Sequence, residues 1–162
     1  MMEQQVIPYG RQNITQEDLD AVITVLKSDY LTQGPKIIEF EKAFATYVGC
    51  KFALMVNSGS SANLLALSLL TNPMRKKKLN PGDEVIVPVV CWSTSLWPII
   101  QHGLKPIFVD IDLKNLNISL EKLKSKITKK TRAIFCVHVL GLSADMIELK
   151  KTGWMSNRGR QN

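Results

Sequence analysis

Between residues 52 and 139, short apolar runs alternate with segments of helical periodicity, and this alternation limits the possible folds more than any other feature. Four apolar runs occur at residues 52–56, 84–90, 107–109 and 132–139, and helical patterns separate them at residues 60–70, 93–102 and 119–127. Strands that alternate with helices form parallel sheets, because parallel pairing requires a long crossover. The runs lack polar alternation, which is typical of strands covered on both faces. The sequence therefore predicts an α/β fold around a parallel sheet.

Two helices are expected before this region. The segment Thr15-Gln16-Glu17-Asp18 resembles a capping box, and apolar residues follow it at helical spacing, which predicts a helix over residues 16–27. A second amphipathic helix is expected to end at Gly49, since glycine is common just after a helix C-terminus. Its apolar positions are Ile37, Phe40, Phe44 and Val48.

Composition argues against membrane and secreted classes. The apolar fraction of 45% is ordinary for a globular protein. The first ten residues show no basic cluster followed by an apolar run, so no secretory signal is expected. The longest apolar stretch, residues 133–142, is far shorter than the ~20 residues of a membrane helix. A soluble, cytoplasmic protein is the expectation, with no membrane partner.

Cysteine spacing and charge exclude further classes. Cys50, Cys91 and Cys136 form no C-x-x-C pair, which argues against a disulfide scaffold and a structural zinc site. The formal net charge is +7, and residues 75–78 form a basic run within a turn-rich loop. No interleaved aromatic residues accompany this run, so no nucleic-acid partner is expected. The positive charge also suits an anionic small substrate such as a sugar nucleotide.

Small polar residues follow the first expected strand, at the place where parallel sheets bind ligands. The segment Asn57-Ser58-Gly59-Ser60-Ser61 leads directly into a helix. The backbone N–H groups of Ser60 and Ser61 and the helix dipole would favour a phosphate, and Gly59 would allow it to approach. Serine and glycine are also ordinary helix caps, so both interpretations stay open from this segment alone. The segment matches neither the dinucleotide fingerprint, nor the P-loop, nor the hydrolase nucleophile motif.

Three more residues stand at expected strand ends. Trp92 follows the second strand, where its ring could lie flat against a planar cofactor or could fill space in a core or interface. Asp110 follows the third strand and is a common type of capping or turn residue. His138 lies in the fourth apolar run, and taken alone a histidine there is more often structural than catalytic.

Taken together, residues 7 to about 146 resemble the DegT/DnrJ/StrS family of pyridoxal-phosphate (PLP) dependent sugar aminotransferases and their dehydratase relatives. The segments that carry the resemblance occur in family order and spacing over nearly nine-tenths of the chain. They are Ile7-Pro8-Tyr9-Gly10, Leu31-Thr32-Gln33-Gly34-Pro35, Val56-Asn57-Ser58-Gly59-Ser60-Ser61-Ala62, Pro81-Gly82-Asp83-Glu84-Val85, Pro106-Ile107-Phe108-Val109-Asp110 and Val137-His138-Val139-Leu140-Gly141.

The resemblance implies the three-layer fold of PLP-dependent transferases, like the large domain of aspartate aminotransferase, with PLP as cofactor. At matching positions it implies that Ser60 and Ser61, beside Gly59, contact the PLP phosphate through their backbone. It further implies that Trp92 stacks on the pyridine ring, that His138 lies near the cofactor, and that Gly34 belongs to a loop near the substrate. Implied partners are a nucleotide-linked keto-deoxysugar, an amino donor and a second copy of the chain.

The family also needs residues that this sequence does not supply in family position. These are an acid that pairs with the pyridine nitrogen, and a lysine for the Schiff base or, in some dehydratases, a histidine in its place. The expectation is an N-terminal fragment without a catalytic residue of its own, or alternatively an inactive subunit that pairs with a full-length homologue. The expected organisation is an arm and helices over residues 1–50, half of a PLP-binding domain over residues 51–155 and a disordered tail over residues 156–162.

Overall fold

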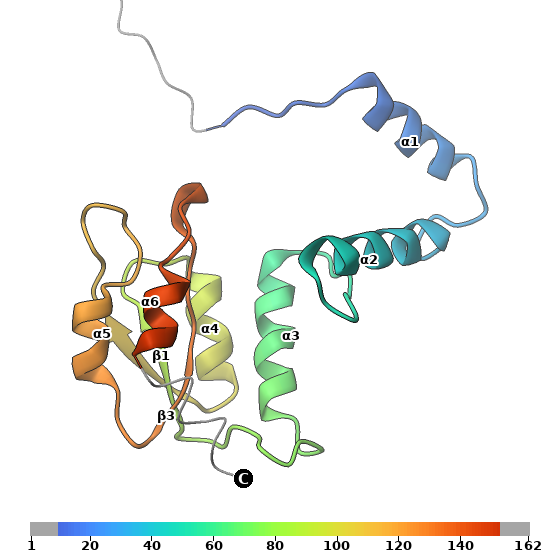
Figure 1. Cartoon of the computed structure of the whole chain (residues 1–162). Coiled ribbons are helices and arrows are strands. Elements are labelled where there is room, and N and C mark those ends of the chain that lie inside the picture. Colours follow the sequence, from blue (N-terminus) through green and yellow to red (C-terminus); the bar gives the residue numbers. More distant parts are fainter. Residues whose placement is uncertain (1–9, 153–162) are drawn as a thin grey trace, which may run out of the picture. The chain divides into compact units, whose positions relative to one another are not determined.

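The computed structural model describes residues 10–152 of the chain. The expected tail and the segment Ile7-Pro8-Tyr9 lie outside the described residues. The described chain divides into two compact units, with the boundary between Met55 and Val56. Each unit is described by itself (Figure 1).

The first unit contains the two helices expected from the sequence, α1 (Gln16–Leu26) and α2 (Pro35–Val48). The capping box is confirmed, since the Thr15 hydroxyl accepts from the backbone N–H of Asp18 while the Asp18 carboxylate accepts from the backbone N–H of Thr15. Helix α2 begins with proline, which suits a first helical position because no N–H is needed there. It ends at Gly49, whose φ of 70° lies in the left-handed region that glycine adopts without strain.

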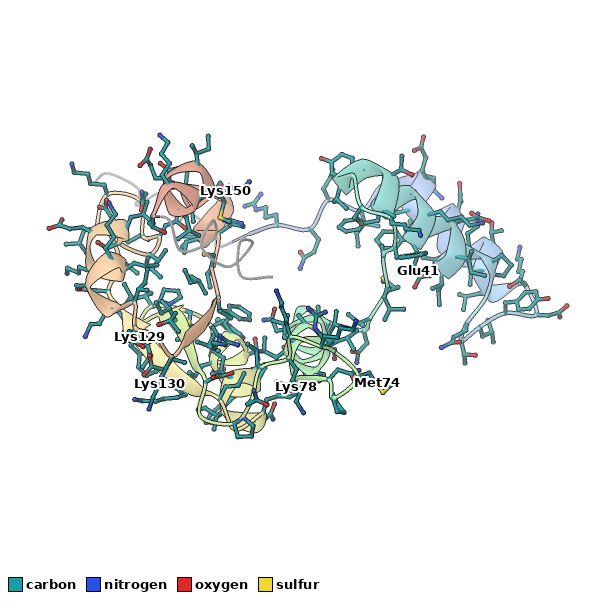
Figure 2. The ribbon with its side chains drawn as sticks, turned by 60° about the horizontal axis from the view of Figure 1, so that its bottom comes forward. Glu41, Met74, Lys78, Lys129, Lys130 and Lys150 are labelled. Carbon is teal, nitrogen blue, oxygen red and sulfur yellow. The ribbon has the colours of Figure 1, made fainter. Side chains whose placement is uncertain are left out.

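The strand expected at residues 52–56 is absent from the structure. The backbone N–H of Met55 donates instead to the Glu41 carboxylate of α2 at 2.8 Å, and Figure 2 labels Glu41 on that helix. Phe52 and Leu54 are 78% and 69% exposed. The apolar run has strand character, but a strand exists only where another strand supplies hydrogen bonds, and this segment finds none among the described residues.

The second unit is a three-layer α/β structure, as the sequence predicted, although its sheet has three strands where four were expected. The strands are parallel and follow the order β2-β1-β3. The elements in chain order are α3 (Gly59–Thr71), β1 (Glu84–Pro88), α4 (Ser93–Gln101), β2 (Lys105–Val109), α5 (Leu120–Lys126), β3 (Thr131–Ile134), η1 (Val139–Gly141) and α6 (Met146–Lys151).

Alternate side chains of the central strand β1 build a core on each face of the sheet. Val85 and Val87 pack with residues of α3 and α4, whereas Ile86 packs with residues of α5 and α6. All three side chains are completely buried. Complete burial stabilises a fold by about 1.5–3 kcal/mol for each side chain of this size. The two cores explain why β1 reads as a continuous apolar run.

Strand β3 is shorter than the expected run over residues 132–139, and Pro88 accounts for the difference. In β1, the N–H of Glu84 donates toward β3, to Lys130 O, whereas the N–H of Val89 donates to Val109 O next to β2. Pro88 has the same orientation as Glu84 but carries no N–H. The last bond between β1 and the β3 side is therefore the one from Phe135 N to Ile86 O, at 2.7 Å.

The loops that lead into the parallel strands, at the end of the sheet where the strands begin, carry much of the positive charge. The basic run at residues 75–78 lies in the loop between α3 and β1, and Lys129 and Lys130 precede β3. Figure 2 shows Lys78, Lys129 and Lys130 in these loops.

No helix within residues 10–152 is long and apolar enough to cross a membrane.

Glu84 places a buried carboxylate at the start of β1. It accepts hydrogen bonds from Thr128 Oγ1 at 2.5 Å and from Lys105 Nζ at 3.4 Å. The Thr128 bond, followed by the lysine, holds the pKa of Glu84 below its usual value. A carboxylate whose folded-state pKa is depressed stabilises the fold above its unfolded pKa, about 4.3, and this contribution is lost as pH falls through the folded pKa.

The substitution Thr128→Val is therefore expected to reduce the dependence of stability on pH. Without the hydroxyl, the folded-state pKa of Glu84 moves back toward its unfolded value, so acid removes less of the unfolding free energy. Urea unfolding at about pH 7 and about pH 3 measures the difference, on either side of the glutamate range. Ser125→Ala, which removes an exposed hydroxyl on α5, serves as control. An equal loss of stability in acid for the parent and Thr128→Val would contradict the assignment.

Candidate functional site

The expected site residues of the second unit lie where its parallel strands end. Trp92 follows β1, Asp110 follows β2, and His138 follows β3. Helix α3 begins at the same end of the unit, to which η1 also belongs (Figure 1). Since the carboxyl ends of parallel strands meet at one edge, the topology gathers these residues at the edge where α/β proteins bind ligands.

The N-terminus of α3 leaves two backbone donors open. Ser58 is the N-cap, and its hydroxyl accepts from the backbone N–H of Ser61 at 3.2 Å. The N–H groups of Gly59 and Ser60 have no acceptor among the described residues. No heavy atom lies within 4 Å of where a Cβ on Gly59 would stand, so the backbone of Gly59 is open on that side. Open N–H groups at the positive end of a thirteen-residue helix suit a phosphate.

This geometry refines the expectation for Ser61. Its N–H is already used by the cap, and its hydroxyl donates to Asn57 Oδ1 at 2.6 Å. Gly59 and Ser60 are therefore the better donors to an anion, and a bond from Ser61 would require Ser58 to release it. Contact of any of the three with a phosphate stays a prediction.

A carbonyl left free by a proline inside α4 links that helix to α3 through a hydrogen bond. Pro98 has no N–H for the carbonyl of Thr94, four residues earlier. Asn63 Nδ2 donates to this freed carbonyl at 3.3 Å. The sequence analysis missed this link, although a free carbonyl four residues before a proline within a helix can be recognised from the sequence. The link holds the first turns of α3 and α4 together.

A pocket of about 240 Å³ lies along the contact between α3 and α4. The serines at the start of α3 line one side of it, and one face of α4 lines the other. Its lining residues are Ser60, Ser61, Leu64, Thr94, Trp97, Pro98 and Gln101. The open end of α3 thus borders a hollow of the surface.

Trp92 is exposed rather than packed in the core of its unit. It is the N-cap residue of α4, and 76% of its surface is accessible. The alternative that Trp92 fills the core of this unit is therefore wrong for the described residues. Stacking of this ring on a cofactor agrees with its exposure and stays a prediction.

His138 and Asp110 have defined partners. His138 Nδ1 accepts from the backbone N–H of Ala144 at 3.0 Å. The Asp110 carboxylate accepts from Lys122 Nζ at 2.5 Å and from the backbone N–H of Ile111 at 2.9 Å. Lys122 is the main reason that the pKa of Asp110 lies below its usual value. Asp110 thus pairs with Lys122 and with its own neighbour Ile111, and it is not part of a turn or a helix cap. The relation of His138 to a cofactor stays a prediction.

Gly34 belongs to the first unit, where it is the N-cap residue of α2. A Cβ at this position would lie 2.6 Å from Tyr30 Cβ, so the close approach of Tyr30 requires glycine. Gly34 also lines a pocket of about 220 Å³ within this unit, with Tyr30, Leu31 and Thr32 among its neighbours. Its expected role near a substrate stays a prediction.

The cysteines and acidic residues offer no second type of site. The three cysteines are free, and burial raises the pKa of the Cys91 and Cys136 thiols. A raised pKa lowers the fraction of reactive thiolate. Within residues 10–152, no three His, Cys, Asp or Glu side chains are grouped so that they could hold a metal ion.

Comparison with known protein families gives one match that covers most of the chain. The model of the DegT/DnrJ/EryC1/StrS aminotransferase family matches residues 12–155. GDP-4-keto-6-deoxy-D-mannose 3-dehydratase of Yersinia pseudotuberculosis is 45% identical over 144 residues, which cover 89% of this chain and 36% of that protein. UDP-4-amino-4-deoxy-L-arabinose–oxoglutarate aminotransferase of Shewanella sediminis is 34% identical and is likewise covered over 36% of its length.

Solved structures agree in fold with this chain. The GDP-4-keto-6-deoxy-D-mannose-3-dehydratase of E. coli, with bound hydrated PLP, aligns with a TM-score of 0.86 and 40% identity over 90% of this chain and 37% of its own. A protein of Streptococcus pneumoniae described as a "putative sugar aminotransferase", in its PLP form, aligns with a TM-score of 0.79 and 31% identity, over 90% of this chain and 36% of its own. The chain therefore spans little more than a third of the length of these relatives.

Proposed function

Because the chain belongs to the DegT/DnrJ/EryC1/StrS aminotransferase family, we propose that it forms the phosphate-binding part of a PLP-dependent enzyme that acts on nucleotide-linked sugars. The observation that supports this most directly is the open N-terminus of α3, with the free N–H groups of Gly59 and Ser60 at the carboxyl edge of the sheet. An exposed aromatic ring, Trp92, begins the neighbouring helix α4.

The donor set fits this cofactor. PLP offers a phosphate dianion, a flat ring and an aldehyde, and when bound it would supply an electron sink for negative charge that develops on the substrate. In the proposed site, Gly59 and Ser60 hold the phosphate through their N–H groups, and Ser61 supports it when the Ser58 cap opens. Trp92 covers one face of the ring and keeps water from it. His138 presents a ring nitrogen near the cofactor. For the first unit, taken by itself, we propose that the loop with Gly34 contacts substrate in the whole enzyme.

The substrate class follows from the relatives. Relatives include GDP-linked keto-deoxysugar dehydratases and a UDP-sugar aminotransferase that uses oxoglutarate. We propose a nucleotide-linked keto-deoxysugar and an amino donor as partners in the whole enzyme, which acts as a homodimer in the cytoplasm. Transamination and 3-dehydration both stay open. A lysine at the Schiff-base position would favour the first, and a histidine the second.

We place that position, and the acid that pairs with the pyridine nitrogen, outside these 162 residues. The chain's lysines, such as Lys150 and Lys151, occur in no family motif, and Lys151 is paired with Glu148 at 2.5 Å. Taken alone, the chain is then proposed to bind PLP without turning over a substrate.

A second candidate function is an inactive subunit that pairs with a full-length homologue. The exposed leucines of α3 favour it, since Leu64, Leu65 and Leu69 are 40%, 42% and 55% accessible. Apolar side chains gathered on one helix are a common feature of protein interfaces. In this alternative the homologue supplies the missing residues.

Borohydride trapping tests the proposal. Purified chain mixed with PLP and reduced with borohydride is expected to carry no stoichiometric adduct on a single lysine, because the Schiff-base position is proposed to lie outside these residues. Mass spectrometry of the intact protein and of its peptides measures the adduct. The Streptococcus pneumoniae relative that was solved in its PLP form serves as a positive control. One fully modified lysine in this chain would show that it has its own PLP-binding amine and would contradict the proposal.

A further inference from the structure

Asn117 is a buried amide that joins two loops at the carboxyl edge of the sheet. Only 2% of the residue is exposed. Its Oδ1 accepts from the backbone N–H of Val139 at 3.2 Å, and its Nδ2 donates to the carbonyl of Leu142 at 3.3 Å. Val139 and Leu142 are the two ends of one turn, residues 139–142, called the η1 turn below. The two bonds therefore attach both ends of this turn to the loop that carries Asn117. Buried amides that use both ends in this way are costly to replace, because partners are left unpaired.

The η1 turn needs such support. Leu140 has a φ of 49° and Gly141 a φ of 85°, so two successive residues lie in the left-handed region. For a residue with a side chain this conformation is strained. Within the turn itself, Leu142 N donates to Val139 O at 2.8 Å. Leu116, next to Asn117, also has a positive φ of 59°. Strained residues persist where the surroundings fix them, and they gather at functional sites.

The η1 turn determines which hydrogen bond the His138 ring accepts. His138 directly precedes it, and Ala144, shortly after it, donates its N–H to His138 Nδ1 at 3.0 Å. A nitrogen that accepts a hydrogen bond carries no proton, so the neutral imidazole has its proton on Nε2. Among residues 10–152, Nε2 has no hydrogen-bond partner, which leaves an N–H donor available.

We infer that Asn117 is a positioning residue for His138: by holding the η1 turn it keeps the Ala144 N–H on Nδ1 and so selects the Nε2–H form of the ring. A histidine in this form can donate one hydrogen bond to a bound group and cannot accept one at that nitrogen. The tautomer follows from the geometry alone. Only the statement that PLP or its substrate receives the bond rests on the proposed function.

Imidazole nitrogen NMR of the whole chain, at a pH where both histidines are neutral, tests the inference without any cofactor. The chain has two histidines, and His102 serves as an internal reference because its ring contacts Pro98 O and Ser68 Oγ instead. In the parent, His138 is expected to show one tautomer, Nε2–H. In Asn117→Ala, the Nδ1–H population is expected to rise several-fold while His102 stays unchanged. The control Asn63→Ala removes a side-chain hydrogen bond between α3 and α4 and should leave the tautomer of His138 as in the parent.

A folded Asn117→Ala chain with His138 still entirely in the Nε2–H form would overturn the inference and leave Asn117 a structural role only. So would a parent chain whose His138 carries its proton on Nδ1. If the His102 signals show that Asn117→Ala does not fold, Asn117→Asp decides. This variant keeps the acceptor for Val139 and loses the donor to Leu142, so mixed tautomers support the inference and a single Nε2–H form contradicts it. Loss of PLP binding in any variant with an unchanged tautomer would bear on the proposed function instead.

Discussion

Replacing Ser60 by aspartate is expected to weaken PLP binding to this chain without destabilising the fold. Ser60 is the second residue of α3 and is exposed beside the open N–H groups. At about 5 Å in a water-like medium, two unit charges repel by roughly 0.8 kcal/mol, and a phosphate dianion doubles this, so binding weakens about tenfold or more. Negative charge in the first turn of a helix is itself stabilising, by about 0.3–1 kcal/mol.

The opposite signs of these two effects make the test specific. Ser60→Asn is the matched control, because asparagine has the size of aspartate without its charge. Equilibrium dialysis with PLP gives the affinities, and urea unfolding gives the stabilities. The expected order of affinity is parent, then Ser60→Asn close to it, then Ser60→Asp far weaker. Equal affinities of the Asp and Asn variants would place the phosphate elsewhere, and a less stable Asp variant would contradict the open helix N-terminus.

Local sequence signals predicted helices α1 to α5, although not α6 or η1, because the ends of a helix are encoded by a few neighbouring residues. The box of Thr15 and Asp18, the glycine after α2 and the Ser119 cap of α5 each act over three or four positions. Burial on both faces likewise predicted β1, since Val85, Ile86 and Val87 need no partner's sequence to be recognised as apolar. Each of these features is therefore encoded by the residues within the element or directly beside it.

Strand pairing was predicted less well because it depends on distant partners. The apolar run at residues 52–56 has strand character, yet β1 already pairs with β2 on one side and β3 on the other. Beyond the end of β3, Pro88 in another strand supplies no N–H to the β3 side. No local pattern in residues 52–56 or 132–139 contains this information.

The sequence predicted at which edge of the sheet the candidate residues lie, but not the hydrogen bonds that they make. The carboxyl-edge rule places Ser60, Trp92 and His138 together from the order of elements alone. The sequence could not show that Ser58 occupies the N–H of Ser61, because capping geometry decides which donor remains free. Nor did it point to Asn117, which was an unremarked polar residue until its burial and its two bonds became visible.

The most direct test of the central claim, that the N-terminus of α3 is the phosphate end of a PLP site, is amide NMR of the chain titrated with PLP and, in parallel, with pyridoxal. Pyridoxal has the same ring and aldehyde but no phosphate. PLP is expected to shift the amide signals of Gly59 and Ser60 most, with a smaller change at Ser61 because its N–H is bonded to Ser58. Pyridoxal should leave these signals nearly unchanged. Equal responses to both compounds, or PLP shifts confined to the basic loop at residues 75–78, would contradict the claim.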